Sequence, residues 1–425
     1  MKQRKWLVLS SLLGVLVLVA AACNGDDDAG DNGDGDGATC PEGDTCVEIG
    51  AGEPIRVGTL LVITGENASL GLDSQHGVEL AVDYWGDEAF DGTAGQLAGH
   101  DIELVNEDEG CSAEGGTAGA TALASDPSIV AVVGTSCSSA GEPAAQILSD
   151  AQVSVVSPSN TAPSLTDPAT HQEFYLRTAH NDKVQGAAMA QFVAEELGVT
   201  TAATIHDGSP YADQLQQVFA DTLTSEYGGE VTAQEGIAVG DTDFGPLLNS
   251  IAADSPEFLY FPIFVAEGGL ITAQAREIGG LDDTDLGGAD GMLTPDWIDA
   301  AGADSAEGVF LSGPDLGFAG GFYEEEFIPA YEDQFGEPTS VFHAHSFDAA
   351  NMIFQALEEV AIEDGDGLLI PRIALKDALF SITGYEGIVG TLDCTPTDEA
   401  IGDCNAGATI TVSEVQDGEF VVVWP

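Results

Sequence analysis

The chain has 425 residues, of which 44% are hydrophobic, and this is enough apolar material for two folded cores rather than a disordered polymer. Nine Lys and Arg residues stand against 73 Asp and Glu residues, giving a formal net charge of −64. Such a surface repels phosphate backbones, which excludes a nucleic-acid-binding function. Because the acids are spread along the whole chain, we interpret the charge as adaptation to a salty habitat rather than as a cation-binding surface.

The N-terminus has the pattern of an export signal. Three basic residues among the first five precede an apolar run that ends at Ala22 and is too short for a convincing membrane span. We therefore expect residues 1–22 to be a signal peptide, whose loss leaves six basic residues against 73 acidic ones and a net charge of −67. The residues before Cys23 are similar to the lipobox of bacterial lipoproteins, although Ala20 stands where that motif usually has Leu. This predicts a lipid on Cys23; the alternative is an ordinary secretory signal with Cys23 unmodified.

Residues 23–53 are predicted to be a lipid-anchored, flexible acidic linker. Positions 24–39 contain Gly, Asp and Asn with almost nothing apolar, so they cannot bury surface. A calcium loop is the alternative, but such a loop needs a Glu at its last position and flanking helices, which are absent. We expect no metal site and no cofactor.

From Pro54 onward, buried strands alternate with helices, a pattern that predicts a parallel sheet with helices on both faces. The predicted strands are 55–63, 101–105, 128–134 and 153–157, and the predicted helices are 71–85, 113–125 and 141–150. The alternation restarts after Arg177, which indicates a second unit of the same kind. Its strands are 201–206, 230–236 and 258–264, and its helices are 182–197, 210–226, 243–253 and 267–278.

The C-terminal part has a different pattern. A strand at 308–312 is followed by helices at 320–335, 344–361 and 371–381. Three segments at 390–393, 409–412 and 419–423 then have the pattern of antiparallel strands that extend one of the sheets.

Six cysteines remain when Cys23 is set aside, and they fall in neighbouring pairs. Many connectivities are possible, but proximity and an oxidising compartment favour three disulfides. These are Cys40–Cys46, Cys111–Cys137 and Cys394–Cys404. None has C-x-x-C spacing, which argues against a zinc site.

Two strand-to-helix loops are rich in hydroxyl groups, GTSCSSAG at 134–141 and SPSNTAP at 157–163. In open parallel sheets, ligands bind beyond the carboxyl ends of the strands. Hydroxyls and backbone N–H groups at a helix N-terminus suit an anion, so the two loops could hold both oxygens of one carboxylate. The alternative is that these hydroxyls only cap their helices.

Several stretches of the chain resemble the bacterial leucine/isoleucine/valine-binding proteins. The longest runs without a gap from Gly134 to Gly186, and the others are IHDGSPYADQL, AQAREIGGL and AGADSAEGVFLSGP. The resemblance covers about residues 55–425. It implies an α/β fold of the type I periplasmic-binding-protein class, with two doubly wound parallel-sheet lobes joined by a hinge. Lobe 1 would comprise 54–178 plus 314–387, and lobe 2 would comprise 179–313 plus 388–425.

The resemblance also implies a ligand site. Ser138 and Thr161 would bind the carboxylate of an amino acid, and the carbonyl of Ser159, next to Asn160, would accept from its ammonium. Asp290 would be the acidic partner of the ammonium, where the family often has Glu; a simple turn residue is the alternative. The family's Cys111–Cys137 disulfide would hold Ser138 in place.

The same comparison gives an apolar pocket for the ligand side chain. It would be lined by Tyr211, Phe264 and Leu70, with Phe264 standing for a Tyr and Leu70 for an aromatic residue. This suits a branched aliphatic or aromatic ligand, although each residue could simply belong to a core.

The expected function is that of an extracytoplasmic solute-binding lipoprotein of an ABC importer. We expect a monomer, held at the cell membrane by the lipid on Cys23, that delivers a branched-chain or similar amino acid to an ABC permease. The alternative is a ligand-sensing receptor domain for amides, urea or aromatic acids. An enzyme is not expected, because Ser138 breaks the G-x-S-x-G motif and no histidine is tied by motif to a nucleophile.

Overall fold

The computed structural model describes residues 38–86, 89–90, 95–317, 321–405 and 407–425. Ala38–Pro425 forms one compact unit. The predicted signal peptide at 1–22, the acylation site Cys23 and the linker up to residue 37 lie outside the described residues.

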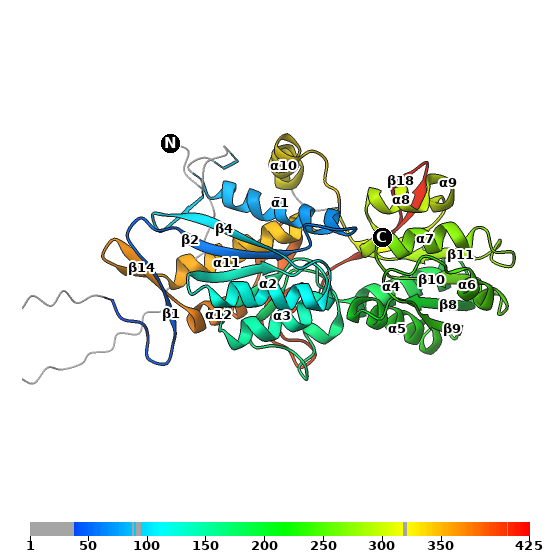
Figure 1. The fold of residues 1–425 in the computed structure, drawn as a ribbon, viewed down its shortest axis with the longest axis horizontal. Coiled ribbons are helices and arrows are strands. Elements are labelled where there is room, and N and C mark those ends of the chain that lie inside the picture. The colour runs from blue at the N-terminus through cyan, green and yellow to red at the C-terminus, as the bar shows by residue number, and fades with distance from the viewer. Residues whose placement is uncertain (1–37, 87–88, 91–94, 318–320, 406) are drawn as a thin grey trace, which may run out of the picture. The chain divides into compact units, whose positions relative to one another are not determined.

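The first large sheet has the strand order β3-β4-β2-β5-β6-β7, and all its pairs except β3–β4 are parallel. Its strands are β2 (Ile55–Leu61), β3 (Gln96–Leu97), β4 (His100–Asp108), β5 (Ile129–Gly134), β6 (Ser154–Ser157) and β7 (Tyr175–Arg177). Helix α1 (Ala68–Tyr84) packs on α11 (His343–Val360), while α2 (Ala113–Ser125) packs on α3 (Ser138–Asp150) (Figure 1). Two separate hydrophobic clusters cover the two faces of this sheet.

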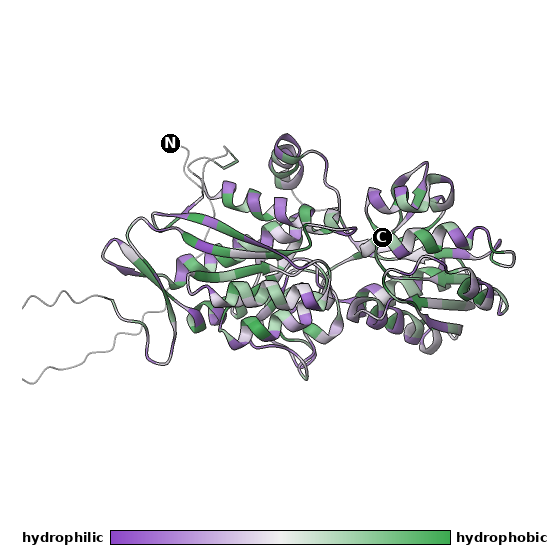
Figure 2. Ribbon diagram, in the orientation of Figure 1, coloured by the Kyte–Doolittle hydropathy of each residue, from purple (hydrophilic) through white to green (hydrophobic). Residues whose placement is uncertain are grey.

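The second large sheet has the order β18-β17-β12-β11-β10-β8-β9. Its strands are β8 (Thr201–His206), β9 (Glu230–Gly236), β10 (Phe258–Tyr260), β11 (Asp285–Gly288), β12 (Phe310–Pro314), β17 (Ile410–Gln416) and β18 (Glu419–Trp424). Its helices are α4 (Asp182–Glu195), α5 (Pro210–Ser225), α6 (Gly245–Ala252), α7 (Val265–Ala275), α8 (Pro295–Ala301) and α9 (Ala303–Ala306). Figure 2 shows hydrophobic colouring along the middle strands of both sheets, in agreement with their burial. This pair of parallel-rich sheets, each covered by helices, confirms the predicted α/β class.

The chain passes between the two sheets at three places. It leaves the first sheet between β7 and α4, returns to it after β12, and leaves it again between β16 (Gly390–Leu392) and β17. The first crossing, at residues 178–181, directly precedes α4.

Part of the predicted linker is wrong, because residues 46–49 form strand β1 (Cys46–Ile49). This strand pairs antiparallel with β14 (Gly367–Pro371), which also pairs with β13 (Ile362–Asp364). Alternate residues Val47 and Ile49 point into the core, and the carboxylate of Asp44 accepts hydrogen bonds from the first turn of α12 (Arg372–Phe380). The partner of this short strand lies more than 300 residues away along the chain, so local composition gave no sign of it.

The first of the three C-terminal strands also departs from expectation. Strand β16 pairs only with β15 (Tyr385–Gly387), in a two-stranded ribbon, and does not extend a large sheet. Its Leu392 is buried in the core of the first sheet. The other two, β17 and β18, extend the second sheet antiparallel to β12, as predicted.

All three predicted disulfides are confirmed: Cys40–Cys46, Cys111–Cys137 and Cys394–Cys404. Within the described residues, no helix combines the length and the apolar composition that a membrane span requires.

Candidate functional site

The two hydroxyl-rich loops meet at the carboxyl ends of β5 and β6. Ser138 is the first residue of α3, and its Oγ accepts a hydrogen bond from the backbone N–H of Ala162 at 3.3 Å. The hydroxyl of Thr135 donates to Oδ1 of Asn160 at 2.8 Å. Predicted site residues from both loops are therefore adjacent, at the positive end of a 13-residue helix.

The four predicted residues of these loops are all buried, but their side chains are engaged differently. The hydroxyl of Ser159 donates to the carbonyl of Ser136 at 2.8 Å, so it joins the two loops. Asn160 accepts from Thr135 and from the Tyr175 hydroxyl. By contrast, the Oγ1 atom of Thr161 is buried and makes no hydrogen bond of ordinary geometry among the residues that the structure describes, and the carboxyl of Asp182 lies close to it. A buried polar atom of this kind is typical of a place that a ligand fills.

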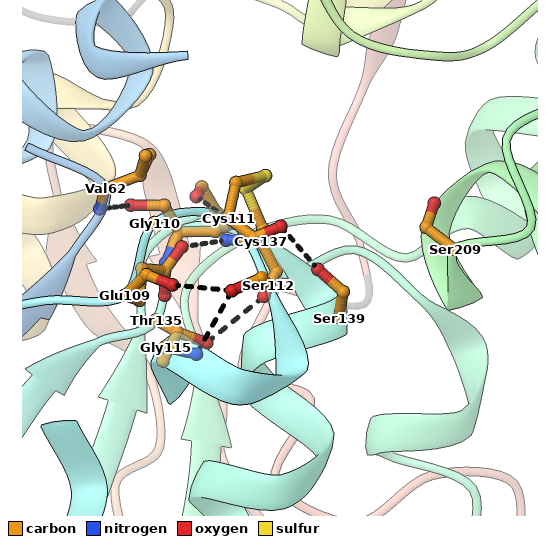
Figure 3. The surroundings of a disulfide bond; sticks show 12 residues. Val62, Glu109, Gly110, Cys111, Ser112, Gly115, Thr135, Cys137, Ser139 and Ser209 are labelled. Atoms are coloured by element: carbon orange, nitrogen blue, oxygen red, sulfur yellow. Dashed lines mark hydrogen bonds between the residues drawn. A yellow bond between two sulfur atoms is a disulfide. The ribbon is translucent and has the colours of Figure 1, made fainter. Parts of the chain in front are cut away.

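The buried carboxylate of Glu109 and the Cys111–Cys137 disulfide hold the loop that contains Ser138. Both carboxylate oxygens of Glu109 accept backbone hydrogen bonds, from Ser136 at 3.0 Å and from Cys137 at 2.8 Å. Figure 3 shows Glu109 beside the Cys111–Cys137 disulfide, with the hydroxyl of Ser139 donating to the carbonyl of Cys111 at 3.2 Å. Burial raises the pKa of Glu109 to about 8. The hydrogen bonds from the two backbone N–H groups lower this pKa, but burial has the larger effect. Sequence reasoning found the disulfide but missed Glu109.

Asp290 lies at the end of the second sheet, just after β11, and is buried. Its Oδ1 accepts hydrogen bonds from the Tyr211 hydroxyl at 3.1 Å and from the amide of Gln185 at 2.7 Å. Burial raises the pKa of Asp290, and the neighbouring His180 opposes that shift. Two residues predicted from different segments, Tyr211 and Asp290, are thus in direct contact.

Asp182 connects the hydroxyl loops to Asp290, and it is a site residue that the sequence analysis missed. Its backbone N–H donates to the carbonyl of Thr161 at 3.0 Å, and one of its carboxylate oxygens lies within 4.8 Å of one from Asp290. Neither carboxylate oxygen of Asp182 makes a hydrogen bond of ordinary geometry in the described part of the chain, although the Thr161 hydroxyl lies near enough to lower the pKa of Asp182. Burial and, next, the charge of Asp290 raise the pKa of Asp182 well above its usual value. The only signal in the sequence was a pair of polar residues at the start of a helix that directly follows a crossing.

An apolar cluster lies beside these polar groups. Leu70 from α1 packs in a buried cluster with Val62, Ala179, Val341 and Phe342, and Phe264 and Leu293 pack against it. The rings of Phe264 and Tyr211 are 5.2 Å apart. Leu70 follows a strand of the first sheet and Phe264 follows a strand of the second, so segments from both sheets meet at this cluster. The Thr294 hydroxyl also donates a hydrogen bond to the hydroxyl of Ser69, at 3.3 Å. The predicted pocket residues Leu70, Tyr211 and Phe264 are brought together.

The fold and this arrangement define a class of two-sheet α/β solute-binding proteins. Residues 54–418 match the model of the periplasmic binding protein family, and the chain belongs to that family.

Among known relatives, the chain is 27% identical over 314 residues to the leucine-, isoleucine-, valine-, threonine- and alanine-binding protein of Pseudomonas aeruginosa, covering 74% of this chain and 80% of the relative. In structure it is similar to a leucine-binding protein from Thermotoga maritima, with a TM-score of 0.74 and 22% identity over 87% of this chain and 97% of the other. It is also similar to the branched-chain amino acid transporter substrate-binding protein of Streptococcus pneumoniae, solved with isoleucine, with a TM-score of 0.72 and 24% identity over 88% and 100%. These comparisons confirm the predicted type I fold and the resemblance to the leucine/isoleucine/valine-binding proteins. The relatives are binding proteins and not enzymes.

Proposed function

We propose that this chain binds an α-amino acid with an apolar side chain and delivers it to an ABC permease. The lobes would be the predicted residues 54–178 plus 314–387 and residues 179–313 plus 388–425, except that the segment with Ile388, Leu392, Cys394 and Cys404 packs in the core of the first sheet and so belongs to the first lobe. Closure about the crossings would trap the ligand between the two lobes. The names of the relatives support this class of ligand. The observation that carries the proposal is the buried acid pair Asp182 and Asp290, joined through Thr161 to the Ser138 loop.

The Ser138 loop would bind the ligand carboxylate. The hydroxyls of Ser138 and Thr161 and the N–H groups at the start of α3 are donors that suit an anion. Glu109 and the Cys111–Cys137 disulfide would hold this loop rigid, which lowers the conformational cost of binding.

The acid pair would bind the ligand ammonium. A buried carboxylate is stable only when it is paired or protonated, and the oxygens of Asp182 make no hydrogen bond of ordinary geometry among the described residues. An ammonium group offers three donors, which could be shared by Asp182, Asp290 and the carbonyl of Ser159. The ligand side chain would then point toward Leu70 and Phe264.

The location of the protein is part of the same proposal. Export by the signal at 1–22 and acylation of Cys23 would place a monomer outside the cytoplasm, tethered to the membrane by a lipid. Two of the three disulfides fasten loops next to ligand-binding or crossing segments, and disulfides persist in such an oxidising compartment.

Calorimetry on the mature protein in high-salt buffer tests the function. We expect binding of leucine, isoleucine or valine, and loss of at least tenfold in affinity, about 1.4 kcal/mol, in both Ser138→Ala and Asp290→Asn. Asp304→Asn, in short helix α9, is the matched control and should leave affinity unchanged. A leucine analogue without the ammonium and one without the carboxylate should each bind far more weakly. Unchanged affinity in both site variants would refute the assignment.

A further inference from the structure

Three side chains of the buried site could hold a metal ion. His180, Asp182 and Asp290 each offer one ligand atom, and these atoms lie within 4.8 Å of one another. All three residues are buried, with exposed fractions of 0%, 0% and 5%. We propose that they form a binding site for a divalent transition-metal ion such as Zn²⁺, which competes with the amino acid for the same carboxylates. This inference goes beyond the proposed function, which involves no metal.

The hydrogen bonds of Gln185 determine the tautomer of His180. The Gln185 amide nitrogen donates to Oδ1 of Asp290 at 2.7 Å and to the carbonyl of Ser312 at 3.1 Å. The Gln185 oxygen therefore faces Nε2 of His180, and this nitrogen must carry the hydrogen. The lone pair of the imidazole then lies on Nδ1, a buried atom that has no hydrogen-bond partner within the described residues. The proposed site requires this nitrogen as the ligand atom of His180. A ligating histidine held through its second nitrogen is the usual arrangement in metal sites.

The charges of the cluster also suit a divalent cation. Two buried carboxylates this close repel each other, and the nearby Arg177 is already paired with Asp403 at 3.0 Å. A proton on one carboxyl also relieves this repulsion, and a divalent ion that displaces the proton would compensate both carboxylates at once. The charges are therefore compatible with the ligand set that the geometry of the atoms offers.

The ligand set selects the class of metal. One imidazole nitrogen and two carboxylate oxygens suit Zn²⁺ or Co²⁺ better than Ca²⁺, which prefers six to eight oxygens. A motif search could not find this set, because Asp290 lies more than 100 residues along the chain from His180 and Asp182. Zn²⁺ at this place would occupy the oxygens that the ligand ammonium needs, so the two should exclude each other.

The test uses the mature protein, freed of metal by a chelator and studied with excess Mg²⁺ to occupy the exposed carboxylates. Zn²⁺ affinity is measured by calorimetry, and Co²⁺ is added to obtain a visible spectrum that reports its coordination. We expect one tight site in the wild type and at least a tenfold loss of Zn²⁺ affinity in His180→Gln. His206→Gln is the matched control, because His206 also lies near an acid, with its Nδ1 atom 3.7 Å from Asp213, but is partly exposed. It should behave as the wild type.

Measurements of leucine binding distinguish the proposed metal site from the proposed function. Leucine should weaken Zn²⁺ binding at least tenfold in the wild type, because its ammonium would occupy the same carboxylate oxygens. Wild-type Zn²⁺ affinity in His180→Gln, or simultaneous binding of Zn²⁺ and leucine, would overturn the metal site. If His180→Gln fails to fold, Asp182→Asn must show the same loss of Zn²⁺ binding. Absence of amino acid binding in metal-free wild type would refute the proposed function and leave the metal result standing.

Discussion

Arg177 and Asp403 form a buried ion pair that joins the 157–163 loop to the third crossing of the chain. The guanidinium donates to both carboxylate oxygens of Asp403, at 3.3 and 3.0 Å, and also to the carbonyls of Asn160 and Ala162. The amide of Asn181, in the first crossing, donates to the same carboxylate at 2.9 Å. The carboxylate of Asp403, in the third crossing, thus also binds the first crossing, and these are the two places where the chain leaves the first sheet.

Arg177→Met should destabilise the protein by about 3–5 kcal/mol, because it leaves Asp403 buried without its cation. The partly exposed ion pairs of Arg56 with Glu103 and Asp126 provide the control, and Arg56→Met should cost about 1 kcal/mol or less. Urea unfolding curves measure both values. The double variant Arg177→Met with Asp403→Leu should recover part of the loss; no recovery would contradict the ion-pair account.

Loss of the Cys111–Cys137 disulfide should weaken ligand binding as well as stability. The bond closes a loop of 26 residues, for which chain entropy gives about 3 kcal/mol, and it holds the residue before Ser138. We expect the double Cys→Ser variant to bind leucine at least tenfold more weakly. The matched control replaces Cys40 and Cys46, whose bond fastens β1 and should not affect affinity. Equal affinities in the two double variants would show that the Ser138 loop needs no fastening.

Gly141→Ala should weaken binding by separating the two hydroxyl loops. A Cβ atom at position 141 would lie 2.3 Å from Oδ1 of Asn160 and 2.9 Å from Oγ1 of Thr135, so the contact between these residues must open. At least a tenfold loss in calorimetric affinity is expected. Gly279→Ala is the control, because no atom lies within 4 Å of its added Cβ. The prediction fails if both variants bind alike.

Asp348 should make stability fall as pH rises. Burial raises the pKa of this carboxyl to about 7 in the folded state, although it accepts backbone hydrogen bonds from Ile388 and Val389. Between the unfolded and the folded pKa only the folded state keeps the proton, so the free energy of unfolding decreases by up to about 1.4 kcal/mol per pH unit from pH ~4 to ~7. Asp348→Asn should reduce the slope by this contribution, measured by urea unfolding at several pH values, while the contribution of Glu109 remains. The exposed Asp398→Asn should keep it, and a slope unchanged in Asp348→Asn would contradict the prediction.

The sequence predicted elements best where strands and helices alternate without interruption. Helix α2 at 113–125 and strands β8 at 201–206 and β9 at 230–236 were predicted to the residue. Prolines explain two deviations. The strand predicted at 258–264 ends at Tyr260, two residues before Pro262, and the helix predicted at 320–335 contains a π-helical turn at Tyr323–Phe327 followed by α10 (Ile328–Phe335), which begins next to Pro329.

The site was predictable only in part. Loop position and family resemblance pointed to Ser138, Thr161, Tyr211 and Asp290, because such residues follow strands that end at one edge of a sheet. His180, Asp182, Gln185 and Glu109 were missed, since their roles depend on contacts between segments far apart in the sequence. Burial decides these roles, and spacing alone does not encode it.

Strand β1 determines where tension on the N-terminal segment would act. A pull on the backbone at residue 38 would first meet the Cys40–Cys46 bond and the shear-resistant pairing of β1 with β14, reinforced by the Asp44 contacts to α12. Strand β2, which carries the centre of the first sheet, would be shielded from that load. Motion of the N-terminal segment would therefore act on β1 and β14 before it reached the loops that hold Ser138.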